Sequence, residues 1–254
     1  MRYTIFFVIV FLFCTWSLTA QRIDDLQSFV KQEKALIQEL ESEYDAVVYD
    51  RQGSFIVQEG DLFGYYVDEV GEVLPPIYDR ILTLGDSEVA LSLNDLWAIY
   101  KNGEPLTEFA FTRVLGKVGD GYAVYQGKAF GIYFTDGTFH EDDFYKAGRF
   151  DMPPKMCHIE TGECGDDFSM ELLKNVAFPP LARELGLSGR VILELYISEF
   201  GDLDYAFVVQ SAGYLLDQAV LELFETHDVQ FDPAILDGVP VASMTRLPFS
   251  FRRH

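Results

Sequence analysis

The sequence predicts an α+β protein in two parts. The first is an N-terminal repeat region of short antiparallel β-strands. The second is a C-terminal domain of two helices on a three-stranded antiparallel sheet. Three observations support this prediction: an abundance of β-forming aromatics (22 Phe and 14 Tyr), aromatic pairs that recur at intervals of 34 and 33 residues, and a C-terminal stretch that switches between strand and helix periodicity.

Composition and charge restrict the partners that the protein can have. The 254 residues include 41 acidic and 19 basic ones, which gives a formal net charge of −22. Because nucleic-acid binding depends on Lys and Arg that neutralise phosphates, this excess of acid argues against a nucleic-acid partner. Contact with an anionic membrane surface is disfavoured for the same reason. We expect a solvated surface on which the negative charges repel one another.

Residues 1–20 have the pattern of a secretory signal peptide. Arg2 supplies a positive charge, residues 4–14 form an apolar run, and Ala20 offers a small residue for cleavage. Cleavage there predicts a periplasmic or secreted protein. The alternative is an uncleaved anchor in the inner membrane that faces the periplasm, since residues 3–20 are mostly apolar and approach the length that spans a bilayer. Membrane contact is expected only in that alternative.

Residues 21–43 predict an amphipathic helix. Apolar side chains recur at steps of three and four from Ile23 to Tyr44, and Glu33 interrupts the stripe. The stripe is too short and too interrupted for a stable coiled coil. A helix that binds a partner is one interpretation, and a helix that covers an exposed sheet edge is the one we favour.

Residues 44–143 predict three repeat units of two or three short strands each. An aromatic step marks each unit, and it stands between two turns; the three steps are Phe63-Gly64, Trp97-Ala98 and Phe130-Gly131. A glycine after the aromatic lets a neighbouring backbone approach closely. Together with the closing segment Pro76-Ile77-Tyr78-Asp79, the pattern resembles the WG β-repeats of bacterial envelope proteins. The resemblance implies stacked structural units, although Ala98 departs from it in the second unit.

Residues 144–171 predict a connector, because glycines and prolines break any long element there. Cys157 and Cys164 enclose a short loop within it. Outside the cytoplasm two such cysteines favour a disulfide. The alternative is a metal site that adds His158, but structural zinc normally has four ligands in paired spacings. We therefore predict a disulfide and no metal.

Residues 172–254 predict the order helix, strand, turn, strand, helix, strand. Prolines and Gly186 bracket the first helix, and Gly201-Asp202 forms the turn between two alternating strands. An apolar stripe from Leu216 to Phe224 marks the second helix. A last alternating strand covers about residues 244–252.

This order resembles the C-terminal domain of TonB, and so do short matches along it. The matching segments include Pro179-Pro180-Leu181-Ala182, Phe200-Gly201-Asp202-Leu203, Leu216-Asp217-Gln218-Ala219, Phe231-Asp232-Pro233-Ala234 and Leu247-Pro248-Phe249-Ser250-Phe251. The resemblance implies that the last strand is a sheet edge to which a segment of an outer-membrane transporter adds itself. The partner-binding residues that it implies are Thr245, Arg246, Leu247, Phe249 and Phe251. Pro248 has no N–H and must lie where the strand is unpaired.

The function that follows is a noncatalytic cell-envelope module that docks on a protein partner, such as an outer-membrane transporter. The alternative is a membrane-anchored, TonB-like energy transducer. The resemblance implies that a transducer has a histidine in its membrane helix and a long proline-rich spacer that crosses the periplasm. Residues 1–20 contain no histidine and the ten prolines are scattered, which disfavours that alternative. The histidines are scattered and form no nucleophile–base pair, so the sequence predicts no catalytic residue and no cofactor; they are His140, His158, His227 and His254.

Overall fold

A helix opens the part of the chain that the structure describes. The computed structural model describes residues 25–51, 53–68, 70–85, 88–142, 150–158, 162, 164–165, 176–226 and 229–252. The signal peptide predicted over residues 1–20 lies outside the described residues, as do His227 and His254. The helix runs over residues 25–40, so it ends earlier than the sequence predicted. Within the described ranges, no helix combines the length and the hydropathy that crossing a membrane requires.

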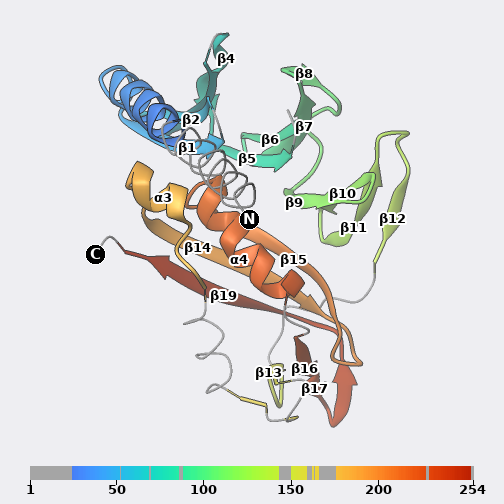
Figure 1. Ribbon diagram of the computed structural model, residues 1–254. Coiled ribbons are helices and arrows are strands. Elements are labelled where there is room, and N and C mark those ends of the chain that lie inside the picture. The colour runs from blue at the N-terminus through green and yellow to red at the C-terminus, as the bar shows by residue number, and fades with distance from the viewer. Residues whose placement is uncertain are drawn as a thin grey trace, which may run out of the picture.

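Three antiparallel sheets of four strands follow one another along the chain (Figure 1). In each sheet the strands pair in chain order. The strands are β1 (Ala46–Arg51), β2 (Ser54–Glu59), β3 (Leu62–Val67) and β4 (Gly71–Tyr78); β5 (Arg80–Gly85), β6 (Glu88–Leu93), β7 (Leu96–Lys101) and β8 (Glu104–Pro105); and β9 (Arg113–Val118), β10 (Gly121–Gln126), β11 (Ala129–Phe134) and β12 (Phe139–Glu141). The first strands begin at residues 46, 80 and 113, which reproduces the intervals of 34 and 33 residues.

The sequence underestimated the number of strands in each unit. It predicted two or three, and the structure has four. The outermost strands β8 and β12 are only two and three residues long, too short to show an alternating pattern. The first strand of each sheet has no aromatic–glycine step to announce it. The sequence pattern therefore marked only the two middle strands of each sheet.

The aromatic steps occupy equivalent places in the three sheets. Each aromatic is the second residue of the third strand, at Phe63, Trp97 and Phe130. A Cβ added at Gly64 would lie 2.6 Å from the carbonyl oxygen of Leu74, and one added at Gly131 would lie 2.3 Å from that of His140. Both distances are shorter than a van der Waals contact. The prediction that these glycines allow close approach of a neighbouring backbone is therefore confirmed.

The C-terminal domain is built on a three-stranded antiparallel sheet in the order β15 (Leu203–Gln210), β14 (Gly189–Ile197) and β19 (Ser243–Phe251). Two helices accompany it, α3 (Pro180–Leu185) and α4 (Tyr214–Thr226). Helix α3 begins after Pro179 and ends at Gly186, whose φ of 74° is left-handed. Two short pairs complete the domain: β13 (Lys155–Cys157) with β16 (Gln230–Asp232), and β17 (Ala234–Leu236) with β18 (Val239–Val241). The predicted mixed α+β class is confirmed.

Strand β14 is buried on both faces. Leu193 and Leu195 pack with Leu216 and Val220 of α4 in the main core. Glu194 and Tyr196 point to the opposite face, and they are 0% exposed as well. The third repeat sheet covers that face through a second cluster, which contains Leu115, Phe130, Tyr196 and Phe207. The sheet of the C-terminal domain is therefore enclosed between its own helices and the last repeat.

The N-terminal helix covers the side chains of a sheet rather than its edge. Val30 and Leu40 pack with Tyr49 of β1, Phe55 of β2 and Leu185 of α3. The edge covering expected from the sequence is therefore wrong, because the apolar stripe meets side chains that project from strands β1 and β2. The helix thereby joins the first repeat sheet to the C-terminal domain.

Glu33, which interrupts the apolar stripe of this helix, is itself buried. Its carboxylate accepts a hydrogen bond of 3.3 Å from the N–H of Gly53. Burial raises the pKa of Glu33, the Gly53 hydrogen bond lowers it, and the charge of Asp68 raises it, with a net increase. The interruption in the stripe is therefore a polar contact between the helix and the turn that links β1 and β2.

Candidate functional site

The candidate site is the outer edge of β19. In the sheet order β15-β14-β19, the strand pairs with β14 on one side only, and no strand of the described part of the chain pairs with its other side. In Figure 1, β19 lies on the side of the sheet away from the repeat sheets. An unpaired edge presents N–H and C=O groups that can bond to another strand. The site is therefore made of main-chain groups.

The direction of these groups follows from two contacts of β14. The N–H of Ser198 donates to Asp202, and the carbonyl of Arg190 accepts from the side chain of Gln210, so both groups point toward β15. Because main-chain groups alternate along a strand, the odd-numbered residues of β14 bond to β19. Their partners are the odd-numbered residues of β19, from Ser243 to Phe251. The groups of Met244, Arg246, Pro248 and Ser250 therefore point away from the sheet.

Pro248 fits this arrangement. It lies opposite Ile192, whose main-chain groups point toward β15 by the same alternation. Its missing N–H would therefore belong to the outer edge, where it breaks no bond with β14. The outer edge thus offers N–H groups from Met244, Arg246 and Ser250, with a carbonyl alone at Pro248 between them.

The five partner-binding residues that the resemblance implied differ in burial and in the direction of their main-chain groups. Phe249 and Phe251 are 4% and 8% exposed and belong to the main core, and Leu247 packs against it. Thr245 is half-buried on the same side of the strand. Arg246 alone combines outward main-chain groups with an exposed side chain. Sequence reasoning also missed Ser250, an exposed residue whose only signal was its even spacing from Pro248.

A buried carboxylate holds β19 from behind. Glu194 is 0% exposed, and Arg113 of β9 binds it through two nitrogens at 3.0 and 3.2 Å. Arg246 binds the same carboxylate at 2.7 and 2.8 Å, and the hydroxyl of Tyr196 donates to it at 2.9 Å. A two-nitrogen arginine contact is among the strongest charge-assisted hydrogen bonds. These bonds join the edge strand, the central strand and the third repeat sheet.

Aromatic rings extend this network. The rings of Phe130 and Tyr196 stack with centroids 4.9 Å apart, and the ring of Phe207 meets that of Tyr196 edge-on at 5.7 Å. The hydroxyls of Tyr125 and Tyr196 are 3.2 Å apart. Burial, with contributions from Tyr125 and Glu194, raises the pKa of Tyr196, so its hydroxyl remains protonated and able to donate. This part of the face of the sheet, around Tyr196, is thus covered by the third repeat sheet.

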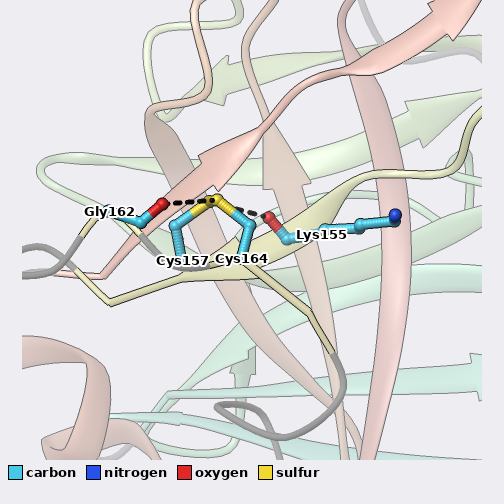
Figure 2. Close-up of a disulfide and its surroundings, with 4 residues drawn as sticks. All are labelled: Lys155, Cys157, Gly162 and Cys164. Carbon is cyan, nitrogen blue, oxygen red and sulfur yellow. Dashed lines mark hydrogen bonds between the residues drawn. A yellow bond between two sulfur atoms is a disulfide. The ribbon is translucent and has the colours of Figure 1, made fainter.

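Cys157 and Cys164 form a disulfide with an S–S distance of 1.97 Å (Figure 2). The sulfur atoms lie 3.5 and 3.6 Å from the carbonyl oxygens of Lys155 and Gly162. Disulfide sulfurs have no hydrogen to donate, so these are close contacts only. Cys157 pairs with Gln230, which places β13 beside β16, and the disulfide ties Cys164 to the same point.

One group in the described ranges could hold a metal ion. It consists of Cys157, Cys164 and Asp232, whose ligand atoms lie within 4.8 Å of one another. Zinc binds thiolates, and the disulfide occupies both sulfurs. His158, which the sequence alternative added, is not part of the group. The arrangement does not fit the metal alternative.

Comparison with known proteins identifies the C-terminal segment. Residues 174–252 match the family described as Gram-negative bacterial TonB protein C-terminal. Protein TonB of Vibrio cholerae serotype O1 is 36% identical over 76 residues, which are 30% of this chain and 30% of that protein. The chain thus matches about a third of the length of this curated relative. The resemblance of the segment to the TonB C-terminal domain is confirmed.

A comparison with solved structures adds no argument. The structure titled "KlHsv2 with loop 6CD replaced by a Gly-Ser linker" aligns with 38% of this chain and 36% of its own chain. The identity is 15% and the TM-score is 0.26, which is too low to support a likeness of fold.

Proposed function

We propose that this chain is a noncatalytic protein-binding module of the bacterial cell envelope. In this proposal its C-terminal domain faces the periplasm and docks on a partner by strand addition along β19. The observation that carries the proposal is the unpaired outer edge of β19 within a segment that matches the TonB C-terminal family. An outer-membrane transporter is the kind of partner that this family suggests.

The geometry of the edge defines how a partner strand would bind. It would accept hydrogen bonds from Met244, Arg246 and Ser250 and donate to the outward carbonyls of the same residues and of Pro248. Residues 44–143, which we propose to be WG-type repeats, would act as a scaffold. They hold Glu194 and Arg246 in place through Arg113, so the edge strand is already ordered before a partner arrives. An ordered strand lowers the conformational cost of docking.

Removing one outward donor tests the proposal. Ser250→Pro deletes an N–H on the outer edge and leaves the bonds between β14 and β19 intact. Ser250→Ala is the matched control, since it removes the hydroxyl and keeps the N–H. Tagged wild-type and variant chains would be purified from envelopes of the producing cells, and the proteins that accompany them would be quantified by mass spectrometry. We expect a partner that Ser250→Ala retains and Ser250→Pro loses by roughly tenfold or more, as the loss of one or more main-chain bonds predicts.

The melting temperatures of the two variants must be similar, which shows that Ser250→Pro has not unfolded the sheet. Equal recovery of every partner with both variants would exclude strand addition at this edge. Such a result would favour a purely architectural role for the domain.

A membrane-anchored transducer is the second candidate. It is supported by the 36% identity to Protein TonB and by the apolar residues 3–20, which could remain as an anchor. Mass spectrometry of the N-terminus of the protein taken from envelopes separates the two candidates. A chain that begins at Gln21 supports the released module, and an intact Met1 supports the anchored form.

A further inference from the structure

A cavity lies where the repeat sheets meet the C-terminal sheet. Its volume is about 660 Å³, and its wall includes residues of all three repeat sheets and of β14, β15 and β19. Pockets that bind small molecules commonly have volumes of several hundred Å³. The volume is therefore sufficient for a small organic ligand.

The charge of the cavity is opposite to that of the protein. Among the residues that the structure describes, its lining includes three arginines, Arg80, Arg113 and Arg246, and no Asp or Glu. The whole chain has 41 acidic residues and only 19 basic ones. A positive cavity in an acidic protein attracts anions, and the surrounding negative surface weakens their binding elsewhere.

The three arginines are not equally available. Arg113 and Arg246 share the carboxylate of Glu194, which neutralises one of their two charges. Arg80 begins β5, is exposed and forms no ion pair with another residue of the described ranges. A guanidinium without a carboxylate partner presents a fork of donors that fits a carboxylate ligand. Arg80 is therefore the arginine best placed to bind one.

The remainder of the wall is largely apolar. Trp97, Phe63, Ile81 and Val114 line the same cavity, together with polar groups from the end of β15. Trp97 is 8% exposed and Val114 is 3% exposed, so each is packed in the core and presents only a small part of its side chain to the cavity. A ligand that satisfies the cavity must combine an apolar body with an anionic end.

We propose that this cavity binds a small amphipathic carboxylate, with its carboxylate on Arg80 and its apolar chain against Trp97. The argument is charge complementarity together with the volume and apolar wall of the cavity. It does not depend on strand addition at β19, since the outward main-chain groups of that strand are not needed.

Trp97 provides a direct measurement. The chain has two tryptophans, Trp16 and Trp97, so the full chain with Trp16→Phe has Trp97 as its sole indole. Octanoate is the probe, and octanamide is its uncharged counterpart of nearly the same shape. We expect octanoate to change the Trp97 emission at concentrations at least about tenfold lower than octanamide, since a charge-assisted hydrogen bond distinguishes them.

Two variants locate the carboxylate. Arg80→Gln should weaken octanoate roughly tenfold and leave octanamide unchanged, again through one charge-assisted bond. Arg252→Gln removes the same charge from an exposed residue outside the cavity, and it should change neither. Ser250→Pro should also leave octanoate binding unchanged, which keeps this test separate from that of the docking edge.

Three outcomes would overturn the proposal. They are an emission that octanoate does not change, equal affinities for octanoate and octanamide, and equal octanoate affinities of Arg80→Gln and Arg252→Gln. The melting temperature of Arg80→Gln, measured without ligand, confirms that any loss of octanoate reflects the arginine and not the fold.

Discussion

The first and the third repeat sheets contact the C-terminal domain by different means. The third sheet meets the open face of the C-terminal sheet through the Glu194 network and stacked aromatic rings. The first sheet meets the start of α4 through close backbone packing, where a Cβ added at Gly213 would lie 2.7 Å from the carbonyl oxygen of Tyr49. The guanidinium of Arg51 lies over the ring of Tyr214, 5.1 Å from its centroid. The contact of the first sheet therefore depends on close packing, and the contact of the third sheet depends on paired charges.

The two contacts therefore act on different parts of the domain. The Glu194 network includes Arg246 on the edge strand, so the third sheet supports the strand that we propose to bind a partner. The first sheet holds the beginning of α4, where Asp217 is buried and accepts bonds from Ser211 and the N–H of Ala212. The contact of the first sheet contains a carboxyl group, that of Asp217, whose pKa is raised to about 6.

The largest effect is expected at Glu194. Glu194→Ala leaves Arg113 and Arg246 without the carboxylate that they share. Breaking a buried pair costs about 3–5 kcal/mol, and because the two arginine side chains are 31% and 56% exposed, we expect the lower end of this range, about 3 kcal/mol. Urea unfolding of the full chain measures the loss. Glu88→Ala is the matched control, since Glu88 is also buried and bonds Lys101 and Lys117 at 2.9 and 2.7 Å.

The control should lose less free energy of unfolding than Glu194→Ala. Each arginine binds Glu194 through two nitrogens, whereas each lysine binds Glu88 through one, so fewer charge-assisted hydrogen bonds are lost with Glu88. Burial raises the pKa of Glu88, but hydrogen bonds from the two lysines outweigh it and lower the pKa overall. Equal losses for the two variants would show that the Glu194 network has no special weight in joining the third sheet to the domain.

The second effect is a pH dependence at the first contact. Burial raises the pKa of Asp217 from 3.8 to about 6, the bonds from Ser211 and Ala212 oppose this, and the charge of Asp50 adds to it. The folded state therefore holds a proton that the unfolded state releases near pH 4. The contribution to stability is fully present below about pH 4 and is lost as the pH rises through 6, by about 3 kcal/mol at most.

Asp217→Asn isolates this contribution, because Asn keeps the acceptor oxygen and does not titrate. The free energy of unfolding of wild type minus that of the variant should fall between pH 4 and pH 6 and stay constant above pH 7. A difference that does not change with pH would mean that Asp217 ionises in the folded state as it does in the unfolded one.

Local patterns predicted much of the fold, because turns, alternation and caps are written in neighbouring residues. The repeat interval, the glycines at 64 and 131, and the cap at Gly186 are of this kind. The contacts between parts were not predicted. Glu194 and Arg113 are 81 residues apart, and nothing near either residue in the sequence indicates the other. The resemblance pointed to β19 as the strand that we propose for docking, but the direction of its outward main-chain groups required the register with β14.

The smallest effect is expected at Gly213. It tests whether the contact of the first sheet depends on close packing, in contrast to the charged contact of the third sheet. Its φ is 101°, which other residues rarely adopt, and an added Cβ would meet the backbone of Tyr49 at 2.7 Å. Gly213→Ala should cost roughly 1–3 kcal/mol in unfolding free energy from backbone strain and the forced separation. Gly137→Ala is the control, because Gly137 also has a positive φ, of 90°, but nothing within 4 Å of an added Cβ. If both variants lost the same free energy, the cost would come from the backbone angle alone, and the first sheet would not depend on close packing against α4.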